Sequence, residues 1–181
     1  MTQLKTTDLA FIGLCAAILC ILAPISIPIP FSPVPVTLAF FAVILTGAVL
    51  GKWKGTICVL VYIMIGLVGF PVFSSYGSGI QKVIGPTGGY LIGYIFLAWF
   101  VGFFAERYPG KRYCYFIGAL IGTVICYAFG TIWLAIQLKM TVMQALAAGV
   151  IPFIPLDLVK IAAAVLVAFP IRNRLALQNI I

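Results

Sequence analysis

The chain has 181 residues, of which 64% are hydrophobic and 8% are charged, whereas soluble domains are roughly 45–50% apolar and about 25% charged. So few ionisable side chains do not cover a water-soluble globule of this size, which argues against a cytosolic enzyme or a nucleic-acid-binding protein. The net charge of +8 reflects eleven Lys and Arg against Asp8, Glu106 and Asp157, an excess that in membrane proteins usually marks cytoplasmic loops and contact with anionic lipid.

The reactive side chains are few. Histidine is absent and only three carboxylates are present, which leaves little for acid–base catalysis or metal binding. The five cysteines all fall inside apolar runs without CxxC spacing, so we predict that they are packing residues. We therefore expect no enzyme activity, no metal site and no cofactor.

Six apolar runs are predicted to be membrane-spanning helices. About 20 apolar residues cross a hydrocarbon layer of roughly 30 Å, and these runs are continuous rather than alternating, which favours helices over barrel strands. Their approximate limits are 8–27, 36–52, 55–73, 87–105, 113–137 and 148–170. With no linker or internal repeat, residues 1–181 are predicted to be one domain. The expected fold is an all-α membrane protein with a bundle of six transmembrane helices.

The basic residues indicate how this bundle is oriented. Lys82 and Lys139 lie on one side and Lys160 lies inside the sixth run, whereas eight lie on the other side: Lys5, Lys52, Lys54, Arg107, Lys111, Arg112, Arg172 and Arg174. Because cytoplasmic loops collect Lys and Arg, both termini are predicted to be cytoplasmic. The loops at 28–35, 74–86 and 138–147 are then outside, as in a multi-pass protein of the cell membrane.

The first outer connection, residues 23–35, holds five of the eleven prolines and no charge. Proline fixes φ and lacks an N–H group, so a segment this rich in proline is stiff and extended. It is either a rigid connector or an apolar wall, with Phe31 at its tip, that shields a bound molecule.

The second outer connection, residues 73–90, combines five glycines with hydroxyl and aromatic side chains directly before a predicted helix. A flexible surface loop would have a similar composition. Glycine permits close backbone approach, hydroxyl groups supply donors and acceptors, and a helix N-terminus presents free N–H groups. This combination favours a ligand-binding loop.

Asp157 and Lys160 are the only ionisable residues in the sixth run, and their spacing puts both on one face of a helix. A charge at the bilayer centre costs at least about 2.5–3.5 kcal/mol, so such residues usually face a cavity or each other. They are therefore either a structural ion pair, with Lys160 able to extend to the interface, or the polar wall of a pocket near the outer face. We favour the pocket.

Small residues recur every four positions in several runs, a spacing that lets helices approach closely. Two of these series, at 47, 51 and 55 and at 118, 122, 126 and 130, are expected to serve internal packing. The first helix keeps one side small, so we predict that it docks a partner subunit through Gly13, Ala16, Ala17 and Cys20. Residues 47–52 have only three residues between their glycines and are followed by Trp53, so they are not a nucleotide-binding loop.

Four segments, in order along almost the whole chain, resemble the BioY family: PVPVTL at 33–38, GLVGFPVF at 66–73, GPTGGYL at 85–91 and PLDLVK at 155–160. This family is the biotin-specific S component of energy-coupling-factor (ECF) transporters. The resemblance implies a subunit that captures biotin from outside. Import would require a transmembrane coupling protein and two cytoplasmic ATPases.

The resemblance also implies roles for individual residues. Asp157 would accept the ureido N–H groups of biotin, and Lys160 would donate to either the ureido oxygen or the tail carboxylate. The remaining contacts would be polar ones from Ser74, Ser75, Gly77, Thr87 and Tyr90 and apolar ones from Phe31, Phe73 and Phe153.

Other functions stay open at this point. The chain could be an S component for another vitamin or a facilitator that needs no energy module. It could also be an intramembrane enzyme with Asp157 as base, or a structural membrane subunit that binds no small molecule.

Overall fold

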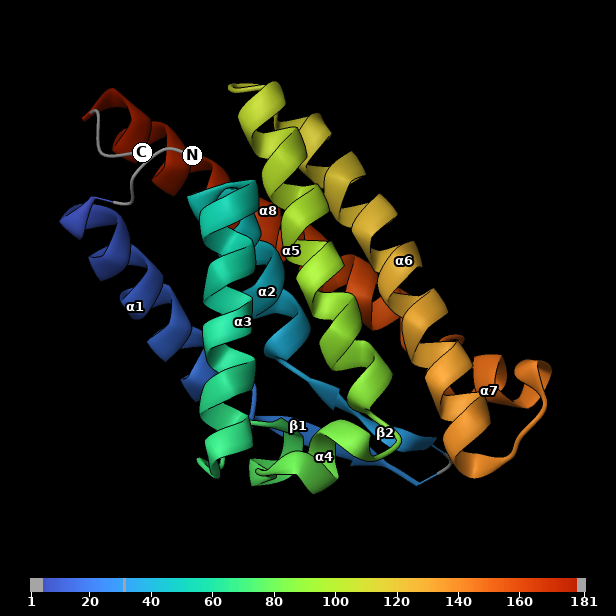
Figure 1. Ribbon diagram of the computed structural model, residues 1–181. Helices are drawn as coiled ribbons and strands as arrows, with labels where there is room; N and C mark the ends of the chain where they lie inside the picture. The colour runs from blue at the N-terminus through green and yellow to red at the C-terminus, as the bar shows by residue number, and fades with distance from the viewer. Residues whose placement is uncertain (1–4, 31, 179–181) are drawn as a thin grey trace.

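The computed structural model describes residues 5–30 and 32–178 (Figure 1). Its long helices are α1 (Thr6–Leu22), α2 (Ala39–Leu50), α3 (Lys52–Val68), α5 (Gly88–Arg107), α6 (Arg112–Leu138) and α8 (Ile154–Leu177). Each overlaps one of the six predicted apolar runs, and α5 and α6 match their predicted limits closely. By length and composition α5, α6 and α8 can cross a membrane, whereas α1 and α2 are shorter apolar helices. The chain is a largely helical membrane protein.

The all-α prediction is wrong at the first outer connection, which forms an antiparallel hairpin of β1 (Ser26–Ile29) and β2 (Ser32–Thr37). Ser26 pairs with Thr37, and the ladder is irregular between Ile27 and Ile29. Proline lacks an N–H group for the ladder, and β-branched residues favour strands. This segment is therefore extended, as predicted, but it is also paired. Because β2 continues to Thr37, α2 starts later than the predicted limit of 36.

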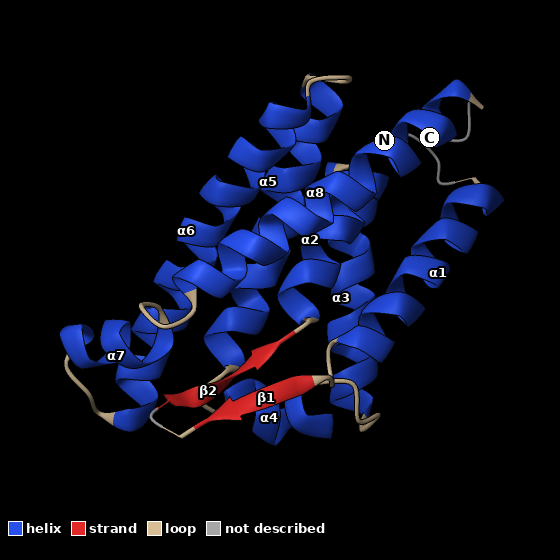
Figure 2. Ribbon diagram, turned by 180° about the vertical axis from the view of Figure 1, so that it is seen from behind, coloured by secondary structure: helices blue, strands red, loops and turns tan. Residues whose placement is uncertain are grey.

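Short elements lie at the same end of the bundle as the hairpin (Figure 2): the 3-10 turn η1 (Ser74–Tyr76), α4 (Ile80–Ile84) and α7 (Val142–Gly149). A capping box begins α7, where Gln144 N–H donates to Thr141 Oγ1 and Thr141 N–H donates to Gln144 Oε1. The predicted limits of the sixth span are therefore wrong: residues 148–149 belong to α7, and α8 runs on to Leu177.

Glycines bring α5 and α6 into close contact, as the four-residue spacing predicted. A Cβ atom on Gly122 would lie 2.8 Å from Leu97 Cδ1, and one on Gly118 would lie 2.8 Å from Phe104 Cβ. Gly89 of α5 faces α6 in the same way, because its Cβ would lie 2.6 Å from the Phe129 carbonyl oxygen. The first small-residue series also packs internally, with Gly47 against Ala98 of α5.

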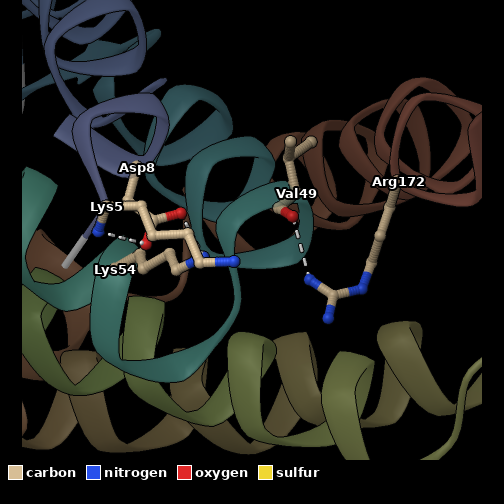
Figure 3. A network of polar contacts seen from close by, with 5 residues as sticks. All are labelled: Lys5, Asp8, Val49, Lys54 and Arg172. Carbon is tan, nitrogen blue, oxygen red and sulfur yellow. Dashed lines mark hydrogen bonds and ion pairs between the residues drawn. The ribbon is translucent and has the colours of Figure 1, made fainter. Parts of the chain in front are cut away.

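Polar contacts tie the helices together at the opposite end, where α1 begins and α8 ends (Figures 1 and 3). Lys54 Nζ lies 2.6 Å from Asp8 Oδ1, which links α3 to α1. Arg172 Nη1 of α8 donates to the carbonyl oxygens of Ala48 and Val49, at 3.2 and 2.9 Å. These carbonyls lie at the C-terminus of α2, where the helix dipole favours a cation.

Candidate functional site

A cavity opens at the end of the bundle that carries the hairpin, with about 610 Å³ of empty space when the open solvent at its mouth is counted. The wall is formed by residues from β2, α2, α3, η1, α5, α6, α7 and α8 and from the connections between them: Val34, Pro35, Thr37, Ala39, Phe40, Tyr62, Phe73, Ser74, Thr87, Tyr90, Leu91, Tyr94, Tyr127, Gly149, Phe153, Asp157 and Lys160. Segments from both halves of the sequence thus meet at one hollow.

Asp157 is the centre of a buried polar cluster in this wall. It lies in the first turn of α8 and is only 5% exposed. Lys160 Nζ donates to Asp157 Oδ1 at 2.8 Å, and Tyr127 Oη donates to Asp157 Oδ2 at 2.6 Å. The ion pair that we considered as an alternative therefore exists, but it also borders a cavity and has a third member.

The cluster retains hydrogen-bonding capacity. Each carboxylate oxygen has two lone pairs, and an ammonium group has three N–H donors. The contacts with Lys160 and Tyr127 occupy one acceptor position on each oxygen of Asp157 and one N–H of Lys160. A ligand that carries both N–H donors and a carbonyl acceptor could therefore pair with both side chains at once.

Aromatic rings make up much of the remaining wall. Phe40 stacks on Tyr127 at 6.3 Å between ring centroids and meets the edge of Tyr94 at 6.4 Å. Tyr62 and Phe73 form an edge-to-face pair at 5.6 Å. The site thus combines a few polar groups with an apolar aromatic surface, as small-molecule sites generally do.

Seven of the ten predicted binding residues line this cavity: Asp157, Lys160, Ser74, Thr87, Tyr90, Phe73 and Phe153. Thr87 is the N-cap of α5, and its side chain makes no capping hydrogen bond. The hydroxyl of Tyr90 donates to the Gly149 carbonyl at 2.8 Å, so this side chain also positions the end of α7.

Two of the other three predicted residues, Ser75 and Gly77, do not line the cavity. Ser75 contacts the hairpin instead, because its N–H group donates to Ser26 Oγ at 2.9 Å. Gly77 pairs with Phe73 in an isolated bridge, and the side chain of Lys82 covers it. Phe31 lies outside the described residues.

The predicted docking residues of α1 are divided between two faces. Gly13 and Ala17 are exposed, whereas Ala16 is buried against the rest of the bundle and Cys20 is half-buried. A Cβ added to Gly13 would meet no atom within 4 Å. Only part of this set is therefore free to touch another chain.

Tyr127 was missed by the sequence reasoning although it contacts Asp157 directly. Tyr62 and Tyr94 were also missed, and both line the cavity. All three tyrosines occur inside apolar runs rather than at their ends. A hydroxyl group within a span needs a polar partner. A tyrosine inside an apolar run is therefore a sequence signal for a buried polar contact.

The sequence profile of the BioY family matches residues 1–177. The chain belongs to the BioY family. Among its BioY relatives, the biotin transporter BioY of Thermotoga maritima is 38% identical over 147 residues, which cover 81% of this chain and 86% of the relative. The probable biotin transporter BioY of Pyrococcus horikoshii is 36% identical over 165 residues, covering 91% and 96%.

A crystal structure of the S component for biotin from an ECF-type ABC transporter has the same fold as this BioY chain. The TM-score is 0.87 at 28% sequence identity, and the match covers 96% of this chain and 94% of the other.

Proposed function

We propose that this chain is the biotin-capturing S subunit of an ECF-type transporter. The observation that carries the proposal is the Asp157–Lys160–Tyr127 cluster in the wall of an aromatic-lined cavity. Relatives called biotin transporters and the similarity to a biotin S component support the choice of ligand.

The chemistry of biotin suits the cluster. The ureido ring offers two N–H donors and one carbonyl acceptor, while the thioether ring and the alkyl chain are apolar. In our proposal Asp157 accepts the ureido N–H groups, and Lys160 donates to the ureido oxygen, because its ammonium group lies 2.8 Å from the same carboxylate. Ser74 and Thr87 contribute polar contacts, while Phe73, Tyr90 and Phe153 pack on the apolar part.

The proposed arrangement in the membrane has six crossing helices, with both termini in the cytoplasm and the cavity near the outer face. Its support is the distribution of basic residues, since only Lys82, in α4, and Lys139, at the end of α6, lie in the segments that connect the long helices at the cavity end. A transmembrane coupling protein and two ATPases would supply the energy. The subunit itself is proposed to act without catalysis and without a cofactor.

Titration of the purified protein with biotin, thiamine and riboflavin tests the proposed function. We expect saturable 1:1 binding of biotin and no binding of the other two vitamins. Preference for another vitamin would assign the chain to a different substrate, and no binding of any of them would favour a purely structural subunit.

The partner of Lys160 can be identified with biotin and its neutral carboxamide. If Lys160 binds the ureido oxygen, Lys160→Ala weakens both ligands by the same factor, since the ureido ring is common to them. This factor is measured from the equilibrium dissociation constants of biotin and of its carboxamide, each for the unchanged protein and for the Lys160→Ala variant. A loss restricted to biotin would place Lys160 at the tail carboxylate.

Tyr127→Phe removes the hydroxyl that donates to Asp157 Oδ2. Hydrogen bonds to charged groups contribute about 1.5–3 kcal/mol, so biotin affinity is expected to fall roughly tenfold to 150-fold. Tyr113→Phe, at an exposed tyrosine near the other end of α6, is the control. Equal affinities of the two variants would remove Tyr127 from the site.

Docking through α1 is tested with Gly13→Trp and Ala17→Trp, because both positions are exposed. We expect these variants to bind biotin normally but to lose co-purification with the coupling protein, since a bulky side chain prevents close helix approach. Val124→Trp, on an exposed face of α6, is the control. Unchanged co-purification of all three would exclude this face of α1.

A further inference from the structure

A second hollow lies at the other end of the bundle, between the start of α6 and the middle of α8. It has an empty volume of about 1,040 Å³ and is an open groove rather than an enclosed cavity. Most of its lining is apolar, and the residues are Gly110, Lys111, Arg112, Tyr113, Phe116, Ala162, Val165 and Leu166. None of them borders the aromatic cavity. We call this hollow the α6–α8 groove.

One end of the α6–α8 groove is basic. Lys111 and Arg112 are exposed at the start of α6, and Arg107 precedes them at the end of α5. The guanidinium group of Arg112 lies 4.8 Å from the ring centroid of Phe169 on α8, so a positive charge bridges the two helices. The apolar residues of α8, from Leu166 back to Ala162, continue from this end along the helix.

Among the described residues, no carboxylate pairs with Arg107, Lys111 or Arg112. The chain has three acidic side chains, and each already forms an ion pair: Asp8 with Lys54, Glu106 with Lys52 and Asp157 with Lys160. The guanidinium group of Arg172 is likewise occupied, by the carbonyls of Ala48 and Val49 at the end of α2, and Figure 3 shows the contact with Val49. The charge beside the groove is therefore available to an anion from outside the protein.

We propose that the α6–α8 groove is a binding site for an anionic phospholipid. An acyl chain packs against Phe116, Ala162 and Leu166, while the phosphate pairs with Lys111 and Arg112. Tyr113 supplies an aromatic side chain at the depth of the headgroups. Basic pockets between transmembrane helices bind anionic headgroups in this way, and the apolar lining explains why a lipid rather than a free anion is the ligand.

Competition between two lipids tests the site. The full chain in detergent is mixed with dioleoylphosphatidylglycerol or dioleoylphosphatidylcholine, and bound lipid is counted by native mass spectrometry. One phosphatidylglycerol is expected to be retained in preference to phosphatidylcholine, and inorganic phosphate should not displace it. Equal retention of both lipids, or displacement by phosphate, would overturn the proposal.

Matched variants locate the site. Each cation near an anionic headgroup contributes roughly fivefold in affinity, so Lys111→Gln with Arg112→Gln should weaken phosphatidylglycerol binding about 25-fold. Lys5→Gln with Arg174→Gln removes the same charge outside the groove and should have little effect. Ala162→Phe fills the groove without changing charge and should also weaken binding, whereas Val167→Phe, at an exposed position outside the groove, should not.

Two further results would contradict the proposal. One is the same loss of lipid in both charge-reduced variants, which would indicate a general surface effect. The other is unchanged lipid binding together with loss of the coupling protein in the Lys111 and Arg112 variant, which would assign the groove to a protein partner. Biotin binding is measured in parallel and is expected to be unchanged in all variants.

Discussion

Asp157→Asn is expected to weaken biotin binding by about 30-fold to 5,000-fold, because removing one member of a buried, hydrogen-bonded charge pair costs about 2–5 kcal/mol. The substitution takes away the negative charge that faces the ligand N–H groups. It also leaves Lys160, whose side chain is 12% exposed, without its counter-charge. Isothermal titration of the purified protein with biotin measures the loss. Glu106→Gln removes a paired carboxylate at the other end of the bundle and should leave affinity unchanged.

A double variant separates ligand binding from stability. Asp157→Asn combined with Lys160→Met removes both charges, so the uncompensated buried ammonium group disappears. Thermal stability is expected to recover relative to Asp157→Asn alone, while biotin affinity stays low. Recovery of both properties would reduce the pair to a structural ion pair and remove it from the binding site.

Gly89→Ala is expected to lower the free energy of unfolding by about 1–3 kcal/mol, the usual cost of overpacking a well-packed interior. The added Cβ would lie 2.6 Å from the carbonyl oxygen of Phe129 and would also contact Trp133 Cβ. Neither group moves freely, because Phe129 contributes backbone of α6 and Trp133 Nε1 donates to the Gly85 carbonyl at 2.9 Å. The helices must therefore separate.

Thermal unfolding in detergent measures this effect, at about 2–4 °C per kcal/mol for a chain of this size. Gly13→Ala is the matched control, since it is also a glycine in a helix but has nothing within 4 Å of its added Cβ. Alanine is favoured over glycine in helices by about 1 kcal/mol, so the control is expected to be neutral or stabilising. A similar melting temperature for the two variants would contradict the close packing of α5 on α6.

Features that depend on neighbouring residues or on solvent could be predicted from the amino-acid sequence alone. Continuous apolar runs indicated the long helices, because a helix satisfies its own backbone in an apolar environment. The spacing of Asp157 and Lys160 placed both on one helix face, and the structure has them in contact at 2.8 Å. The glycine spacing of α6 similarly predicted a face for close packing, because residues four apart share one side of a helix.

The distant segments that complete the site could not be predicted in this way, because they meet only when the helices pack. Tyr127 reaches Asp157 from α6, and Ser75 turns to Ser26 of the hairpin rather than lining the cavity. Strand pairing in a proline-rich segment likewise depends on register between two strands, and composition does not reveal it. These contacts join residues far apart along the chain, so the packing of the helices decides them and the local spacing of residues does not.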